Sequence, residues 1–170
     1  MGTAVTDSNG EFSVNVDTSS PVEIVITGGS FKDEATGQTV DISAGQELSC
    51  VVPDGSSAGS AVVTPLTHIA AAQAKENMQS GQDPVAAVNS ANQNVADQFG
   101  IPDVDITKTD PEDLTEPGSG SDPDSDASKY GLIIAAISHD AANKGKSPDQ
   151  MIDHINGMKE DLKGQFLRRC

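Results

Sequence analysis

Residues 61–66, Ala-Val-Val-Thr-Pro-Leu, mark the point at which a strand-like pattern gives way to a helical one. Thr64 followed by Pro65 is typical of a helix start, because a threonine side chain can accept a hydrogen bond from a free amide of the first turn. Proline fits the next position because it has no N–H to leave unpaired there. Leu66 and Ile69 then continue at helical spacing. The sequence therefore predicts strands before this point and helices after it.

The segment before Thr64 shows the alternation of apolar and polar residues that is typical of half-buried strands. Asn9-Gly10 lies between two such runs, and this dipeptide favours a tight hairpin because both residues tolerate a positive φ. Gly28-Gly29 interrupts a later run, and a polar stretch follows over 32–38. Short strands are predicted at Val5, Phe12–Val16, Val22–Ile26, Thr39–Ile42, Glu47–Val52 and Ala61–Val63. Repeated short strands with glycine-rich turns favour a small antiparallel β-sandwich.

The string Thr6-Asp7-Ser8-Asn9-Gly10-Glu11-Phe12 resembles the T-D-x-x-G-x-F hairpin of carboxypeptidase regulatory-like domains, which are small transthyretin-like β-sandwiches common in bacterial surface proteins. The likeness covers the first third of the chain. Such domains usually begin with an earlier strand pair carrying G-x-V and G-x-P elements, and nothing before Gly2 supplies it. The resemblance therefore implies an incomplete sandwich or a different packing of these strands, and it implies no enzyme activity. Val63-Thr64-Pro65-Leu66-Thr67 is also similar to stretches that follow the β-segment in bacterial surface lipoproteins.

Four helices are predicted in the remainder of the chain. Asp83-Pro84 repeats the cap pattern for a second helix that Gly100 ends, and Ser147-Pro148 begins the last one. The last helix carries a continuous apolar stripe of Met151, Ile152, Ile155, Met158, Leu162 and Phe166. Its methionines would suit an adaptable partner-binding face, but a stripe of this kind is more often core, and we favour core. Two helical hairpins packed as a four-helix bundle-like region are expected.

The predicted organisation has four parts. These are a β-sandwich segment at 1–63, a helical hairpin at 64–100, an acidic Pro/Gly-rich linker at 101–126, and a second helical hairpin at 127–170 that packs on the first. The linker is long for a loop inside a compact domain, so we expect part of it to be mobile. The fold class that follows is α+β.

Asp122, Asp124 and Asp126 alternate within the linker and predict an irregular calcium site, because calcium prefers clustered oxygen ligands. An EF-hand is excluded, since Ala127 occupies the position that needs glycine and Ile133 the position of the bidentate glutamate. The alternative is a solvated acidic linker without a metal, and that alternative is favoured. No other cofactor is expected.

Two cysteines, Cys50 and Cys170, permit one disulfide, which in an exported protein would join the β-segment to the chain terminus. Cys170 is the last residue, where intermolecular pairing is easy, so both states remain open. His68 is expected to be a partly buried neighbour of the β-segment, whereas His139 and His154 are expected to face solvent. None of the three has the spacing of a zinc site.

The net charge of −16 disfavours nucleic acid and anionic membranes as partners, because both need a basic surface. No apolar run is long enough to span a bilayer. The sequence also contains no signal-peptide pattern, so we expect that, if the protein is exported, its leader peptide is missing from this sequence. Serine nucleophile motifs and phosphate loops are missing, and aromatic residues make up only 3% of the chain. These features argue against an enzyme.

The sequence therefore predicts a non-enzymatic structural or adhesive module of a larger bacterial envelope protein, located outside the cell or in the cell envelope. Its partner would be a protein or cell-surface component, with self-association through an open sheet edge as a specific hypothesis. The alternative is a soluble extracellular ligand-binding protein whose site lies between the sheet and the helices.

Overall fold

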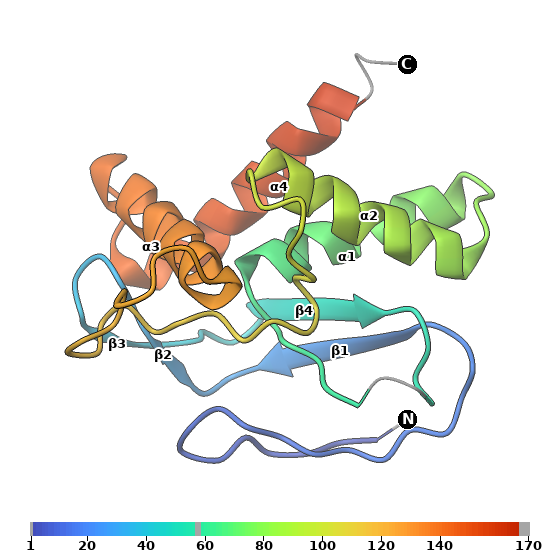
Figure 1. Ribbon diagram of the computed structural model, residues 1–170, viewed down its shortest axis with the longest axis horizontal. Coiled ribbons are helices and arrows are strands. Elements are labelled where there is room, and N and C mark those ends of the chain that lie inside the picture. Colours follow the sequence, from blue (N-terminus) through green and yellow to red (C-terminus); the bar gives the residue numbers. More distant parts are fainter. Residues whose placement is uncertain (1, 57–58, 167–170) are drawn as a thin grey trace.

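A computed structural model describes residues 2–56 and 59–166, with side chains up to Leu162. Small antiparallel strand pairs precede the helices, so the predicted α+β class is confirmed (Figure 1). The elements are β1 (Val22–Thr27), β2 (Ser30–Lys32), β3 (Thr39–Asp41), β4 (Glu47–Val52), α1 (Pro65–Gln79), α2 (Pro84–Gln98), α3 (Asp126–Asn143), a short 3-10 helix η1 (Pro148–Gln150) and α4 (Met151–Phe166).

The four strands are successive parts of one long hairpin rather than two facing layers. β1 pairs with β4, with Val22 opposite Val52, and β2 pairs with β3, with Ser30 opposite Asp41. Only residues 28–29 join β1 to β2, both glycines with positive φ, whereas residues 42–46 join β3 to β4. The arm of the hairpin that contains β3 and β4 is therefore longer than the arm that contains β1 and β2. The ladder is interrupted at residues 28–29, where glycine provides the unusual backbone conformation.

The predicted strands at Val5 and Phe12–Val16 are wrong, because the structure assigns no strand to residues 2–21. The turn between them does form: the Asp7 amide donates to the Glu11 carbonyl at 2.9 Å, and Gly10 has a φ of 80°. Only Gly10 adopts a positive φ, so the turn is a three-residue loop rather than the two-residue type expected from Asn-Gly. The segment keeps its alternating exposure but lacks a ladder to make it a strand.

Residues 61–63 are also not a strand. The Val62 amide instead donates to the Thr107 carbonyl at 2.9 Å. This bond joins the stretch to residues 101–126, which we call the acidic segment. The helix start after it is as predicted: the Thr64 side chain accepts from the Thr67 amide, and the Thr67 hydroxyl accepts from the Thr64 amide. Asp83 likewise caps α2 by accepting from the Ala86 amide. Local capping chemistry therefore fixes both helix starts.

A four-helix bundle is not confirmed. α1 packs extensively against α2 and against β4, and α4 meets both α1 and α3. Figure 1 shows α3 above the β2–β3 end of the hairpin, while α1 and α2 lie above the β1–β4 end. The helices therefore divide over the two halves of the hairpin, because the sheet offers an apolar surface that a bundle would leave uncovered.

The main core lies between α1, α2, α3, α4 and the acidic segment. Its fully buried members include Leu66, Val95, Ile106, Tyr130 and Ile155. The apolar stripe of α4 is core, as favoured from the sequence, with Met151 buried and Met158 and Leu162 packed against the cluster. Phe166, the last member of that stripe, lies beyond the described side chains. Within the described residues, no helix combines the length and apolar character needed to cross a bilayer.

Residues 101–126 contain no helix or strand until α3 begins, as expected from their prolines and glycines. The description of this segment as a linker is incomplete, because Ile101, Val104 and Ile106 are buried in the main core. The buried Tyr130 hydroxyl donates to the Ile106 carbonyl at 3.1 Å and thereby satisfies a main-chain group that has no ladder partner. The segment is part of the folded domain.

Candidate functional site

The three predicted calcium ligands do not come together. Asp122, Asp124 and Asp126 are exposed, and Asp126 is the first residue of α3, directly after its N-cap Ser125. In the part of the chain that the structure describes, no three His, Cys, Asp or Glu side chains are grouped as a metal site. Calcium binding by these residues remains a prediction that the geometry does not support.

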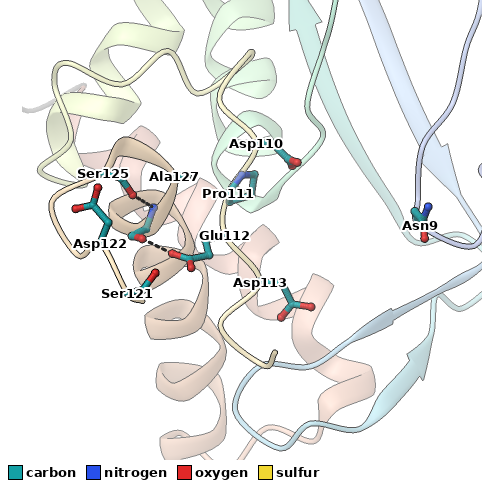
Figure 2. Close-up of a pocket in the computed structure, with 10 residues that line it drawn as sticks. Asn9, Asp110, Pro111, Glu112, Asp113, Ser121, Asp122, Ser125 and Ala127 are labelled. Carbon is teal, nitrogen blue, oxygen red and sulfur yellow. Dashed lines mark hydrogen bonds between the residues drawn. The ribbon is translucent and has the colours of Figure 1, made fainter. Parts of the chain in front are cut away.

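Asp122 instead lines a wide hollow of about 640 Å³ between the acidic segment and the start of α3. Other acidic side chains lining it are Asp110, Glu112 and Asp113. Figure 2 shows that these carboxylates do not converge, because Glu112 and Asp122 lie on one side of the segment and Asp110 and Asp113 on the other. A cation would therefore find no common point of coordination here.

Glu112 joins the acidic segment to α3 at this hollow through hydrogen bonds. Its carboxylate accepts from the Ser128 hydroxyl and from the Gly120 amide, the latter at 2.8 Å. The Ser128 hydroxyl is the main cause of a lowered Glu112 pKa, with the Gly120 amide as a further cause. The Glu112 amide in turn donates to the Ala127 carbonyl at 3.0 Å. These bonds fasten the irregular segment to the first turn of α3.

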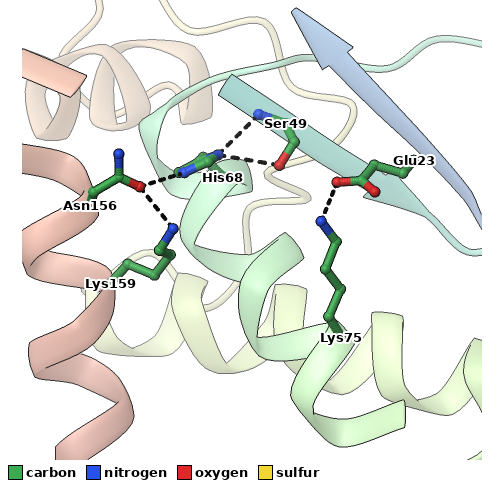
Figure 3. Close-up of polar contacts among 6 residues, drawn as sticks. All are labelled: Glu23, Ser49, His68, Lys75, Asn156 and Lys159. Carbon is green, nitrogen blue, oxygen red and sulfur yellow. Dashed lines mark hydrogen bonds and ion pairs between the residues drawn. The ribbon is translucent and has the colours of Figure 1, made fainter. Parts of the chain in front are cut away.

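A second, smaller hollow of about 290 Å³ lies between β4, α1 and α4. His68 lines this hollow and lies against the β-segment as predicted, but at 5% exposed it is buried rather than partly buried. The Ser49 amide donates to His68 Nδ1 at 3.1 Å, and His68 Nε2 lies 3.1 Å from Asn156 Oδ1 (Figure 3). Since Nδ1 accepts, Nε2 carries the proton and donates to Asn156.

The network continues to the rim of the hollow. Lys159 donates to Asn156 Oδ1 at 2.8 Å, whereas Lys75, which also lines the hollow, forms a separate ion pair with Glu23 at 2.5 Å (Figure 3). Burial lowers the pKa of His68, and Lys159 lowers it further, while the Asn156 bond opposes both. The imidazole is therefore neutral at physiological pH and joins three elements: β4, α1 and α4.

Ser49, His68 and Asn156 have the order of a nucleophile, a base and an orienting group, with Ser49 Oγ 3.2 Å from Nδ1. The geometry does not favour nucleophilic chemistry, because the Ser49 amide already occupies the Nδ1 lone pair. Ser49 is also only 2% exposed, so a substrate could not approach its hydroxyl. No sequence pattern pointed to Asn156, because it lies far from His68 in the chain.

Cys50 is completely buried in β4, and its thiol is free within the part of the chain that the structure describes. Burial raises its pKa to about 12, so the thiol stays protonated and unreactive at neutral pH. Cys170, its predicted disulfide partner, lies outside the described residues, so the bridge stays a prediction.

The expectation that His154 faces solvent is wrong, whereas His139 is exposed as expected. His154 is 8% exposed, and its Nε2 lies 3.0 Å from Asp140 Oδ2. Lys144 pairs with the same carboxylate at 2.8 Å, and this hydrogen bond is the first cause of the lowered Asp140 pKa. His154 therefore links α4 to α3.

The sequence also gave no indication of a buried acid at the tip of the hairpin. Asp33 is buried and accepts from the Ser138 hydroxyl of α3 at 2.5 Å and from the Thr36 amide at 2.9 Å. Next to it, one carboxylate oxygen of Glu34 is buried and has no hydrogen-bond partner among residues 2–56 and 59–166. Burial, followed by the charges of Asp113 and Asp33, raises the Glu34 pKa to about 7.

The chain matches no protein-family model, and no curated protein or solved structure was found to be similar to it.

Proposed function

We propose that this chain is a non-enzymatic structural or adhesive module of a larger extracellular or cell-envelope protein, and that it associates with a second copy through the open edge of β1. The observation that carries the proposal is the different environment of the two edges of the β1–β4 pair. On one edge the Ser49 amide donates to a helix residue, whereas the other edge has no main-chain partner among the described residues.

The Ser49 amide points away from β1, because it donates to His68 on α1. Ser49 lies opposite Val25 in the register, so these two residues form a pair that exchanges no main-chain hydrogen bonds. The N–H and C=O of Val25 must then point to the outer edge of β1. Within residues 2–56 and 59–166, no backbone hydrogen bond reaches them. Val25 also exposes 44% of its surface.

An edge of this kind is a template for strand addition, because its unpaired groups match those of another strand. Two copies of β1 can pair antiparallel about Val25, which gives a closed two-fold contact. A structural rather than catalytic role is further supported by the protonated Cys50 thiol and by the closed hydrogen-bond network around His68. The acidic, aromatic-poor composition suits a solvated exterior.

The test is sedimentation velocity over a wide concentration range with the whole chain and two variants. Val25→Pro removes an outward N–H without touching the β1–β4 ladder, and Val25→Ala keeps that N–H as the matched control. We expect reversible dimers that Val25→Pro abolishes and Val25→Ala retains. A chain that stays monomeric at every concentration would contradict self-association. Protease added to intact cells that make the parent protein tests its exposed location.

A ligand-binding role is the second candidate, and the hollow beside His68 supports it because it lies between sheet and helices. Lys75 and Lys159 stand at its rim with Glu47, so a small zwitterion is the class of ligand that its charges would suit. Heteronuclear NMR with a panel of amino acids would detect such binding as shifts at Ser49 and Ala72. Unchanged spectra throughout the panel would exclude this class.

A further inference from the structure

The chain contains the dipeptide Asn-Gly twice, at Asn9-Gly10 and at Asn156-Gly157. Asn-Gly is the dipeptide in which a side-chain amide is most easily attacked by the next main-chain nitrogen, because glycine has no side chain to obstruct the approach. The two copies have identical local chemistry. Any difference in their reactivity must therefore come from the fold.

Asn9 lies at the tip of the first turn, where the surrounding residues are all exposed. No hydrogen bond to its side chain is present among the described residues. In the described part of the chain, the Gly10 amide donates to the Asp7 carbonyl alone, at 3.1 Å, and the segment has no ladder beyond the turn. A single exposed hydrogen bond of this kind opens readily, because water replaces it at little net cost.

Asn156 is held from several directions. Its Oδ1 accepts from His68 Nε2 at 3.1 Å and from Lys159 Nζ at 2.8 Å (Figure 3). Gly157 lies in the interior of α4, where the helical pattern engages each amide with the carbonyl four residues earlier. The nitrogen and the side-chain carbon that would react are thus both fixed, and α4 would have to unwind locally before they could meet.

We infer that Asn9 is a site of spontaneous deamidation in the folded protein and that Asn156 is protected from it. The Gly10 nitrogen, after losing its proton to solvent, forms a bond to Cγ of Asn9. The bond from Cγ to the side-chain nitrogen breaks, and ammonia leaves, which produces a cyclic succinimide. Water then opens either carbonyl and yields an aspartyl or isoaspartyl residue at position 9. No oxidant or enzyme is needed.

The reaction adds a negative charge beside the acidic segment. Asn9 lines the same hollow as Asp110 and Asp113 and lies across from them in Figure 2. The new carboxylate would repel these acids, and the repulsion would weaken as salt increases. The isoaspartyl product also lengthens the main chain within the turn. Ageing of the protein would therefore loosen the N-terminal segment first. The inference does not depend on the proposed function.

The test is incubation of the whole chain at mildly alkaline pH, followed by peptide mass spectrometry for the replacement of NH by O. Native and urea-unfolded samples are compared, with Asn9→Gln as the control that removes the reactive site. We expect Asn9 to convert at least about tenfold faster than Asn156 in the folded chain, since breaking the hydrogen bonds around Asn156 and Gly157 costs more than one factor of ten in rate. In urea the two rates should converge.

Two results would overturn the inference. One is conversion of Asn156 as fast as Asn9 in the native sample, which would mean that the His68 network and α4 give no protection. The other is an Asn9 that stays intact in the native chain but converts in urea, which would mean that the turn itself is protective. If neither site converted in urea, the Asn-Gly dipeptides would lack the intrinsic reactivity on which the inference depends.

Discussion

Residues 2–21 and residues 101–126 both lack helices and strands, apart from the first residue of α3, yet they relate to the core in opposite ways. Residues 2–21 alternate in polarity along an extended chain, and none of them is fully buried. Residues 101–126 have no periodicity, but Ile101, Val104 and Ile106 enter the main core. The comparison teaches that regular patterning and anchoring to the core are separate properties.

The physical reason lies in the hydrogen bonds available to each segment. A strand requires a partner ladder, and residues 2–21 have main-chain bonds mainly at their turn and near Thr18 and Ser20. The acidic segment satisfies its main chain through side chains instead, such as the Tyr130 hydroxyl at the Ile106 carbonyl. Irregular chain can therefore be buried wherever the surrounding side chains complete its hydrogen bonds.

The largest expected effect comes from Ile106→Ala. Ile106 is 1% exposed, so the change removes buried carbon atoms and leaves a cavity, and we expect a loss of about 3 kcal/mol in the free energy of unfolding. Val14→Ala in the first segment is the matched control and should cost less than about 1 kcal/mol, because Val14 is only half-buried. Urea denaturation measures both. Equal losses of unfolding free energy would show that the two segments are anchored to the core to the same extent.

Gly131→Ala tests a second anchor of the acidic segment. A Cβ at Gly131 would collide with the Glu112 carbonyl oxygen, which belongs to a main chain that α3 holds in place. We expect a net destabilisation of about 2 kcal/mol from overpacking. Gly157→Ala in α4 meets no atom within 4 Å and should stabilise by about 0.5–1 kcal/mol, because alanine favours helix. Thermal melting measures both variants. A shift of both melting midpoints in the same direction would show that the acidic segment can move to accommodate the added methyl group.

Glu34→Gln tests the charge repulsion between the hairpin tip and Asp113 of the acidic segment. The raised pKa of about 7 means that the folded state favours protonated Glu34, so stability is present below pH 4.5 and is lost as the pH rises through 7. The variant should be more stable than the parent by about 1 kcal/mol at pH values above 8, a figure discounted for the partial exposure of Glu34. The advantage should vanish at low pH. An advantage that did not change with pH would assign the effect to packing.

The smallest effect is expected from calcium. Because Asp122, Asp124 and Asp126 do not come together, the melting midpoint should be the same with excess calcium and with a chelator. Magnesium at equal ionic strength controls for general screening of the negative charge. A rise in midpoint specific to calcium, lost in Asp122→Asn, would instead establish a metal site in the acidic segment.

Local signals in the sequence predicted the helix starts and the two long strands, but not the absence of strands at Val5, Phe12–Val16 and 61–63. Thr64 and Asp83 cap helices as their neighbours indicate. The strand from Val22 follows its predicted alternation, and the predicted strand from Glu47 also forms, although its last four residues are all buried. The sequence could not predict which helices share a surface, since that depends on contacts between distant residues. The same limit hid the pairing of His68 with Asn156 and of Asp33 with Ser138, whose members lie 88 and 105 residues apart.

The position of His68 against β4 limits how far the sheet can grow. The Ser49 N–H points to the side where a further strand would pair, but it already donates to the imidazole of His68. A module that can be extended on both flanks propagates into fibres, whereas one that is blocked on one flank stops after a single addition. Association through β1 would thus end at pairs, and a protein built from such modules could crosslink without polymerising.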